Sequence, residues 1–382
     1  MRLETLHKLC SAELLEAIDR NIERRADEVA LDKKTPEAAL VATQVKYLQR
    51  AAAKLPTYYA ARCVIPPLSF EQSSSERVAS TKRLEGDSLL DLTCGLGVDS
   101  LHFSRSFKRV VALERDEVLA AVARENFRRM GVSNVEVICT SAEEYLALCS
   151  EPFDWIYADP DRRSASGAKL VRLEDCSPNI LAAMDHIERI SSGRLMLKNS
   201  PLFDVDEAFR LFSPARVEVV SLGGECKEVL ISTSQSDTLV ATAVDRGSVE
   251  ASREAVQQLF CSGEFEAERY RYLVIPDVAL QKSRMVSYAL GGSVKIWSNN
   301  GFGFSEEAVD HALSRSLEIE RIEEYNPKSL RRELSGSKVE ILKREFPLST
   351  KQITEQLKIK EGGDRRVAFT QIAGRKRVIF LR

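Results

Sequence analysis

Residues 90–104 read LDLTCGLGVDSLHFS, and this stretch decides the fold prediction. The apolar residues 88–94 predict a buried strand, Gly95 and Gly97 interrupt the chain, and apolar positions at helical spacing follow. Asp91 lies at the end of the strand, just before the turn. A strand, a glycine turn and a helix in this order predict a ligand site at the carboxyl end of a parallel strand.

Strand and helix signals alternate on both sides of this turn. Apolar strand segments alternate with amphipathic helices, at residues 88–94, 109–115, 135–140, 153–160 and 193–201. This alternation predicts a parallel sheet covered by helices on both faces. Two further strands, 216–222 and 228–232, are separated by only five residues and predict an antiparallel pair. Residues 238–244 form another strand-like run, so the segment that closes the sheet stays open.

The rest of the chain differs in pattern. Residues 1–66 predict helices, with Thr35 as an N-cap, and Ser73 with Glu76 has the spacing of a capping box. Periodicity weakens after residue 246. The predicted domains are an N-terminal helical region (1–66), the sheet domain (67–245), a linker with a small ferredoxin-like α+β unit (246–310) and a basic α+β unit (311–382).

Composition narrows the class of protein. No run of about 18 apolar residues is present, which predicts a cytoplasmic protein without a membrane partner. The eight cysteines never approach a C-x-x-C spacing, so we expect reduced thiols and no metal site. The net charge is −2, but residues 326–382 contain 15 Lys and Arg against 6 Asp and Glu. This asymmetry predicts a polyanionic partner.

The residues near the turn distinguish two classes of cofactor. A nicotinamide or flavin fingerprint has a third glycine where Ser100 stands, and Asp91 would lie unfavourably beside a pyrophosphate. A sulfonium amino acid carries positive charge, which Asp91 would stabilise. Glu114 ends the second strand, where a carboxylate binds ribose hydroxyls, and the small residue Ala142 follows the third strand beside the expected adenine ring. The sequence therefore predicts S-adenosylmethionine as the cofactor.

Residues 68–244 resemble the class I S-adenosylmethionine-dependent methyltransferases. The resemblance implies a Rossmann-like sheet of five parallel strands with a terminal antiparallel pair. It also implies cofactor contacts by Asp91, Gly95, Gly97, Glu114, Ala142 and Asp159. Residues 68–76 (LSFEQSSSE) resemble a segment that covers the cofactor in several nucleic-acid methyltransferases, which adds Gln72 and Ser74.

The fourth strand ends in ADPDRR, residues 158–163, and provides the predicted catalytic residues. Methyl transfer requires proximity and alignment, and Asp159 with the carbonyl of Pro160 could aim an amine by accepting its N–H bonds. Arg162 and Lys198, at the ends of the fourth and fifth strands, complete the predicted catalytic set. Arg163 is expected to contact an RNA phosphate.

The acceptor atom is less well defined by this motif. Amino-methylating relatives commonly have two prolines and an aromatic residue after the acid or amide, whereas Asp161 and Arg162 stand here. Methylation of carbon 5 of a pyrimidine needs a cysteine nucleophile, and Cys176 lacks the usual proline–cysteine pairing. Nitrogen is therefore the expected acceptor.

The C-terminal residues resemble THUMP-like domains that accompany methyltransferase domains in a bacterial family, and residues 270–304 resemble the ferredoxin-like piece that precedes them. THUMP modules are associated with RNA binding. The predicted phosphate contacts are Arg331, Arg332, Lys343, Arg344, Arg365, Arg366, Arg375 and Lys376.

These observations predict an S-adenosylmethionine-dependent methyltransferase that acts on a nucleotide of structured RNA, such as tRNA or rRNA. Two alternatives stay open. One is a catalytically inert RNA-binding protein that keeps the methyltransferase fold, and the other is a methyltransferase of small molecules.

Overall fold

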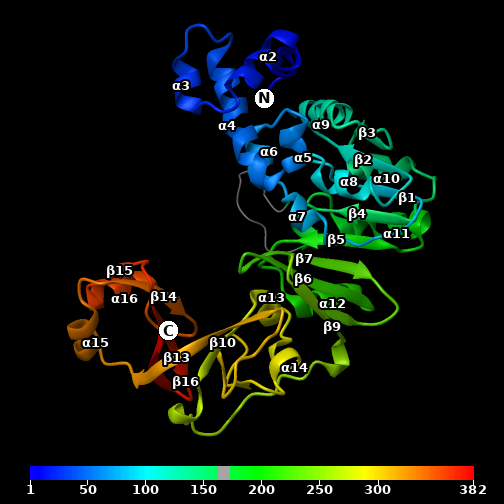
Figure 1. Cartoon of the computed structure of the whole chain (residues 1–382). Coiled ribbons are helices and arrows are strands. Elements are labelled where there is room, and N and C mark those ends of the chain that lie inside the picture. The colour runs from blue at the N-terminus through cyan, green and yellow to red at the C-terminus, as the bar shows by residue number, and fades with distance from the viewer. Residues whose placement is uncertain (162–172) are drawn as a thin grey trace. The chain divides into compact units, whose positions relative to one another are not determined.

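The computed structural model describes residues 1–161 and 173–382, which fall into two compact units. Unit 1 comprises Met1–Ser200 and Leu230–Thr233, and unit 2 comprises Pro201–Val229 and Ser234–Arg382. Figure 1 labels the elements of both units along the chain.

Unit 1 contains the predicted parallel sheet. Its strands are β1 (Ser88–Asp91), β2 (Arg109–Glu114), β3 (Val135–Cys139), β4 (Trp155–Ala158) and β5 (Leu195–Asn199), in the order β3-β2-β1-β4-β5. All four neighbouring pairs are parallel, which confirms the prediction. The strand order reverses between β1 and β4, the place where open α/β sheets bind ligands.

Helices connect these strands: α8 (Val98–Phe103), α9 (Glu117–Arg129), α10 (Ala142–Leu148), the short η1 (Leu173–Asp175) and α11 (Ile180–Ser191). The helix α9 ends before Gly131, whose φ of +70° suits a residue without a side chain. Its buried residues include Ala123 and Phe127, which pack on the sheet side of the helix.

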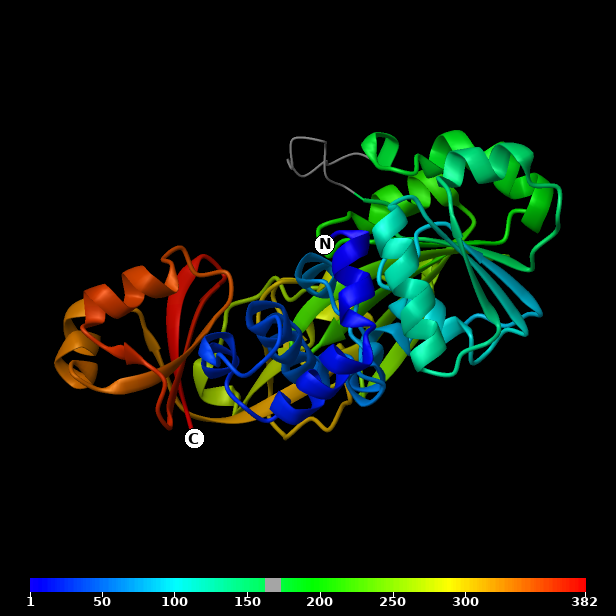
Figure 2. The ribbon, with the colours of Figure 1, turned by 90° about the horizontal axis from the view of Figure 1, so that it is seen from above.

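Seven helices precede the sheet: α1 (Leu3–Leu9), α2 (Ala12–Asn21), α3 (Ala26–Leu31), α4 (Ala38–Lys54), α5 (Pro56–Ala60), α6 (Pro67–Gln72) and α7 (Glu76–Ala79). They share one hydrophobic cluster with α9. Figure 1 shows α5 and α6 close to α9, with α3 and α7 farther from it, and Figure 2 shows the N-terminal helices in blue from above. The fully buried Asn126 of α9 links the two parts, because its side chain bonds both the N–H and the carbonyl of Val64.

Two of the predicted helix caps are wrong. Thr35 does not cap α4, because residues 33–37 form a turn in which the Thr35 hydroxyl donates to Asp32, and α4 begins after Glu37. Ser75 rather than Ser73 caps α7. Glu76 does not close a capping box, since its carboxylate accepts hydrogen bonds from the backbone and hydroxyl of Thr57.

In unit 2, α12 (Val205–Phe212) precedes a group of strands: β6 (Ala215–Leu222), β7 (Glu225–Thr233), β8 (Thr238–Ala243) and β9 (Gly247–Ser252). Residues 225–229 of β7 belong to this unit, and the rest of the strand belongs to unit 1. The predicted strand pair 216–222 and 228–232 corresponds to β6 and β7, which a turn at Gly223–Gly224 joins. β8 pairs parallel to β6 and antiparallel to β9. Two further strands, β8 and β9, therefore follow the predicted terminal pair β6 and β7.

A second sheet of eight strands occupies the remainder of unit 2, in the order β11-β12-β10-β13-β17-β16-β14-β15. Its strands are β10 (Tyr272–Pro276), β11 (Lys295–Ile296), β12 (Gly303–Ser305), β13 (Ser314–Glu324), β14 (Lys338–Lys343), β15 (Lys360–Glu361), β16 (Arg365–Ile372) and β17 (Arg375–Leu381). The accompanying helices are η2 (Arg253–Ala255), η3 (Ala267–Arg269), α13 (Val278–Lys282), α14 (Val286–Leu290), α15 (Pro327–Leu334) and α16 (Thr350–Leu357). This one sheet therefore contains strands from both the predicted unit 246–310 and the predicted unit 311–382.

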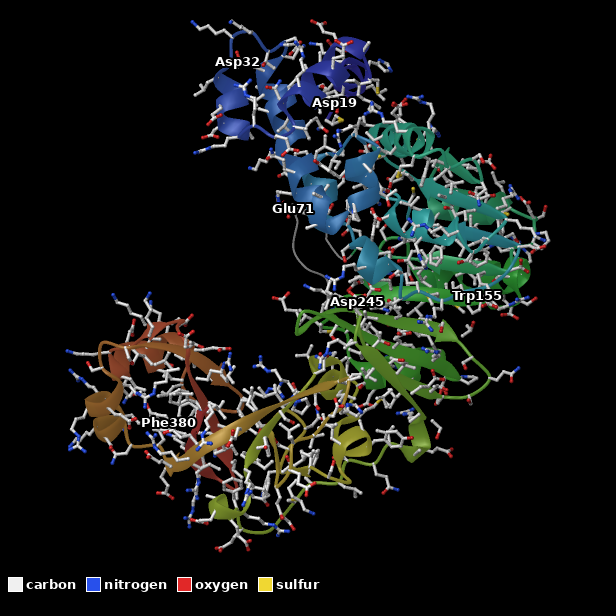
Figure 3. All side chains as sticks on the ribbon, in the orientation of Figure 1. Asp19, Asp32, Glu71, Trp155, Asp245 and Phe380 are labelled. Carbon is white, nitrogen blue, oxygen red and sulfur yellow. The ribbon has the colours of Figure 1, made fainter. Side chains whose placement is uncertain are left out.

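The second sheet carries a core on each face. Phe380, labelled in Figure 3, packs in a cluster with the apolar residues of α15 and α16. Its neighbours in β17, Ile379 and Leu381, pack instead with Phe304 and Tyr270. No helix among the described residues is both long and apolar enough to cross a membrane.

Candidate active site

Asp91 lies at the carboxyl end of β1 and is buried, with 1% of its surface exposed. The N–H of Thr93 donates to its Oδ1 at 2.9 Å, and the hydroxyl of Ser100 donates to its Oδ2 at 2.5 Å. Burial raises the pKa of this carboxyl to about 7. Ser100, the residue in place of a third glycine, therefore holds the acid that precedes the turn.

The glycine turn is constrained by packing as well as by its position. Gly97 has a φ of +88°, and a Cβ there would lie 2.8 Å from the ring of Phe127 in α9. Gly95 has a φ of +56° but no comparable neighbour. A side chain at residue 97 would thus clash with the ring of Phe127, whereas the space beside Gly95 is open.

Glu114 lies at the carboxyl end of β2 and binds the turn directly. Its carboxylate accepts hydrogen bonds from the N–H of Gly95 at 2.9 Å and of Asp116 at 2.8 Å. Burial raises its pKa. The carboxylates of Asp91 and Glu114 therefore lie on successive strands, one on each side of the glycine turn.

The remaining predicted cofactor residues differ in environment. Ala142 is buried at the start of α10, where Ser141 and Glu144 form a capping box. Gln72 is exposed at the end of α6. The Ser74 hydroxyl is buried and finds no hydrogen-bond partner among residues 1–161 and 173–382. Such an unsatisfied hydroxyl fits a ligand contact, although it does not identify the ligand.

The end of β4 meets this turn through Thr93. The N–H of Asp159 donates to the Thr93 hydroxyl at 2.7 Å, and Lys198 of β5 donates to Oδ2 of Asp159 at 2.5 Å. Pro160 is buried beside it. The structure therefore brings Asp91, Asp159 and Lys198 together. Arg162 and Arg163 lie outside the described residues.

Sequence reasoning missed two charged residues behind this site. Asp99, in the first turn of α8, forms ion pairs with Lys82 at 3.1 Å and with Lys198 at 3.8 Å. The hydroxyl of Tyr157 donates to Asp99 at 2.8 Å. Lys82 belongs to the charged stretch TKRLEGD, which reads as a solvated loop, so only tertiary packing reveals that it is buried.

Seven of the eight predicted phosphate contacts in the C-terminal region fall into two groups. Arg331, Arg332, Lys343 and Lys376 are exposed, and their side chains form no hydrogen bond or ion pair within the described part of the chain. Arg365, Arg366 and Arg375 are paired with Glu333, Glu340 and Glu324.

Arg344 is a structural residue rather than an open phosphate contact, and its prediction as such a contact is unsupported by its geometry. Its guanidinium donates to the carbonyl oxygens of Pro276 at 2.7 Å and Gly301 at 3.1 Å. Burial lowers its pKa to about 10.

Two other kinds of site give no further candidates. A cavity of about 480 Å³ lies in unit 2 and is lined by residues of α14 and β11 together with 255–261, none of which is a predicted site residue. No group of three or more His, Cys, Asp or Glu among the described residues could hold a metal ion. The eight cysteines form no disulfide.

Comparison with sequence families matches two parts of the chain. Residues 89–164 match the family described as a methyltransferase domain, and residues 314–382 match the family described as THUMP domain-like. The chain thus carries a methyltransferase domain and a THUMP-like domain, which confirms both predicted resemblances.

Curated relatives match over a shorter stretch. The 23S rRNA (uracil(1939)-C(5))-methyltransferase RlmD of Edwardsiella ictaluri is 39% identical over 106 residues, which cover 25% of this chain and 24% of the relative. The tRNA/tmRNA (uracil-C(5))-methyltransferase of Photorhabdus laumondii is 34% identical over 116 residues, which cover 26% and 31%. The chain therefore spans about a quarter to a third of the length of these relatives.

One solved structure matches nearly the whole chain. The crystal structure of a candidate methyltransferase from Porphyromonas gingivalis W83 has a TM-score of 0.80 at 24% identity, and the match covers 97% of this chain and 96% of that one. This likeness shows that the two proteins share their fold.

Proposed function

From a chain that joins a methyltransferase domain to a THUMP-like domain, we propose an S-adenosylmethionine-dependent methyltransferase that modifies a nucleotide of structured RNA. The observation that carries the proposal is the pair of carboxylates, Asp91 and Glu114, on either side of the glycine turn. Both follow neighbouring parallel strands where the strand order leaves a crevice beside β1.

The chemistry of this pair favours a sulfonium donor over a dinucleotide. The buried Asp91 would repel a pyrophosphate, whereas Asp91 and the half-buried Glu114 complement an ammonium group and ribose hydroxyls. Asp91 would hold the amino acid part of the donor, Glu114 would accept the ribose hydroxyls, and the buried Ser74 hydroxyl would gain a partner. The bound donor supplies an electrophilic methyl group.

Three observations support RNA as the substrate. The C-terminal family match is THUMP-like, the curated relatives are named as rRNA and tRNA methyltransferases, and four exposed cations of that region lack acidic partners within the described residues. The phosphates of an RNA backbone would pair with these four side chains. In a methyltransferase of small molecules these side chains would stay solvated.

The chain also retains an acidic side chain, Asp159, at the end of β4, which favours an enzyme over an inert binding protein. Lys198 holds Oδ2 of Asp159, and the position between Asp159 and the donor site is where an acceptor would bind. Alignment by such a group is the main task of a methyl-transfer enzyme.

We propose nitrogen as the acceptor atom, because Cys94 in the glycine turn and Cys176, beside the Ser177 that bridges to Asp161, are buried and therefore poor nucleophiles. Attack on carbon 6 of uracil requires a thiolate. Cys94, in the glycine turn, is buried, and burial raises the pKa of its thiol. Cys176 is also buried.

The names of the curated relatives favour a second candidate, methylation of uracil at carbon 5. RNA that contains 5-fluorouracil distinguishes the two candidates. A carbon-5 enzyme would remain covalently attached to this RNA, because the fluorine cannot leave as the proton does. Enzyme that transfers methyl groups to ordinary RNA without forming this adduct would support nitrogen.

The central test combines donor binding with RNA methylation. Calorimetry should detect S-adenosylmethionine binding to the full chain and a loss of affinity in Asp91→Ala. Labelled donor should then transfer its methyl group to RNA from a strain that lacks the gene, and mass spectrometry of the nucleosides identifies the product. Binding of RNA without methyl transfer would favour the inert protein, and transfer only to small molecules would favour the other alternative.

A further inference from the structure

Four charged side chains of unit 1 alternate in sign along a continuous path, which we call the charge chain. Nζ of Lys82 lies 3.1 Å from Oδ1 of Asp99, and Oδ2 of Asp99 lies 3.8 Å from Nζ of Lys198. Nζ of Lys198 lies 2.5 Å from Oδ2 of Asp159. The four residues come from the loop before β1, the first turn of α8, β5 and the end of β4.

Exposure increases along the charge chain. The side chain of Lys82 is 0% exposed, those of Asp99 and Lys198 are 12% and 13% exposed, and that of Asp159 is 39% exposed. A buried ion is costly unless an opposite charge pairs with it, so each inner member depends on its neighbours. The most exposed member is the one at the carboxyl end of β4, where a substrate would bind.

Asp99 is the centre of the charge chain. Although burial raises its pKa, the ammonium groups of Lys82 and Lys198 lower the pKa to about 2. The Tyr157 hydroxyl also donates to its carboxylate. Asp99 is therefore an ion near neutral pH and provides a fixed counterion on the inner side of Lys198.

Asp159 keeps one carboxylate oxygen for another partner. Lys198 occupies Oδ2, and the backbone N–H of Asp159 donates to Thr93, which fixes the residue at both ends. Among the described residues, none donates a hydrogen bond to Oδ1 of Asp159. A carboxylate held in this way can accept a hydrogen bond from an N–H group of a nucleobase.

We propose that Lys82 and Asp99 are positioning residues for the methyl transfer, and that they act through Lys198 to fix Asp159 as the acceptor of an N–H of the target base. This inference rests on the proposed function and assigns the recognition of the base's N–H group to one atom, Oδ1 of Asp159. The hydrogen bond would aim the base nitrogen at the methyl group. The N–C bond would form as the S–C bond of the donor breaks, and the proton of the N–H would leave to solvent.

The test is a double-mutant cycle on the rate of a single methyl-transfer turnover, with labelled S-adenosylmethionine and RNA from a strain that lacks the gene. Asp99→Asn should lower the rate about tenfold in the wild-type background and less than about twofold in the Asp159→Asn background. Donor affinity, measured by calorimetry, should not change when Asp99→Asn is added to either background. Such coupling arises only if Asp99 acts through Asp159.

The chain offers a matched control. Lys108 and Asp87 form a surface ion pair with Nζ 2.8 Å from Oδ2, and their side chains are 78% and 70% exposed. Asp87→Asn should leave the turnover rate unchanged. If Asp99→Asn fails to fold, the double variant Lys82→Met/Asp99→Asn replaces it in the cycle, because it removes two buried opposite charges together.

The outcomes separate the two proposals. Equal losses of rate in both backgrounds, or no loss in either, would overturn the positioning role while the methyltransferase activity stands. A wild-type chain that binds RNA and donor but transfers no methyl group would contradict the proposed function itself, and the inference with it.

Discussion

Asp91 is the residue on which the cofactor prediction depends, and the structure adds its electrostatic state. The pKa of about 7 follows from burial, which the bonds from Ser100 and Thr93 only partly offset. A positively charged donor would favour the ionised form. Sequence alone places an acid before the turn. The shift in its pKa depends on the packing of β2, β4 and α8 around it, and no local sequence pattern predicts that packing.

Donor affinity should therefore depend on pH. Between pH 5 and 7 the carboxyl of Asp91 is increasingly ionised, so S-adenosylmethionine should bind up to about tenfold more tightly per pH unit. Asp91→Asn should bind weakly with little dependence on pH. Calorimetry at fixed ionic strength measures both chains, and a pH dependence that persists in Asp91→Asn would assign the effect to another group.

The raised pKa of Asp91 should also affect the stability of the unliganded chain. Its free energy of unfolding should fall as the pH rises, whereas donor affinity should increase. The folded pKa lies above the value of 3.8 for an ordinary Asp, so the folded state binds more protons between about pH 4 and 7. Stability from this residue is thus lost as the pH rises through that range. Relative to Asp91→Asn, the wild-type chain should lose about 2 kcal/mol of unfolding free energy between pH 5 and 7. Urea unfolding at the two pH values provides the measurement, and a constant difference would contradict it.

At the scale of elements, the helix α9 serves two parts of unit 1. One face supports the glycine turn through Phe127, and another holds the N-terminal helices through Asn126. The bounds of this helix have local signals in the sequence, because Asp116 caps it, its apolar residues are periodic and Gly131 follows it. The sequence could not predict the partner of Asn126, since Val64 lies 62 residues away.

Removing this link should destabilise unit 1. Asn126→Ala leaves the buried N–H and carbonyl of Val64 without partners, which should cost about 2–4 kcal/mol of unfolding free energy. Asn126→Asp keeps an acceptor for the N–H but places a charge against the carbonyl, so it should destabilise as well. Urea unfolding monitored by circular dichroism measures both. A loss below about 0.5 kcal/mol would show that water replaces the side chain.

Other elements show where local patterns fail. The caps at Thr35 and Ser73 have suitable residues and spacing, yet tertiary hydrogen bonds to Asp32 and Thr57 decide the local geometry. The 11-residue strand β13 was not predicted, because its alternation of charged and apolar residues in SRSLEIERIEE also suits a helix. Pairing with β10 and β17 determines its conformation.

At the scale of the whole molecule, the second sheet limits how RNA binding can be tested. Residues 272–305 and 314–381 share this sheet, and Ala368, Ile379 and Leu381 pack with Leu273 and Phe304. Deletion of the chain from Asn326 onward would remove β14–β17 and expose this core. A loss of RNA binding after such a deletion would therefore not identify the contacts.

Substitution of surface charges provides the sharper test. Arg331, Arg332, Lys343 and Lys376 should be replaced together by Gln, because these exposed side chains have no acidic partner among the described residues. The matched control replaces Arg365, Arg366 and Arg375, which already pair with glutamates. Four lost phosphate contacts should reduce the slope of log affinity against log salt by about three, whereas the control should change it by less than about one.

Fluorescence titration of RNA from a strain that lacks the gene, at several salt concentrations, measures these slopes. The affinities of the wild-type and substituted chains should differ most at low salt and converge at high salt, because the lost interaction is electrostatic. Donor affinity should stay unchanged in both variants, which shows that the methyltransferase domain is intact. Equal changes in slope for the unpaired and the glutamate-paired residues would mean that pairing with an acid does not decide which of these side chains contact the RNA. An unchanged slope after substitution of the four unpaired residues would mean that the RNA binds to another surface.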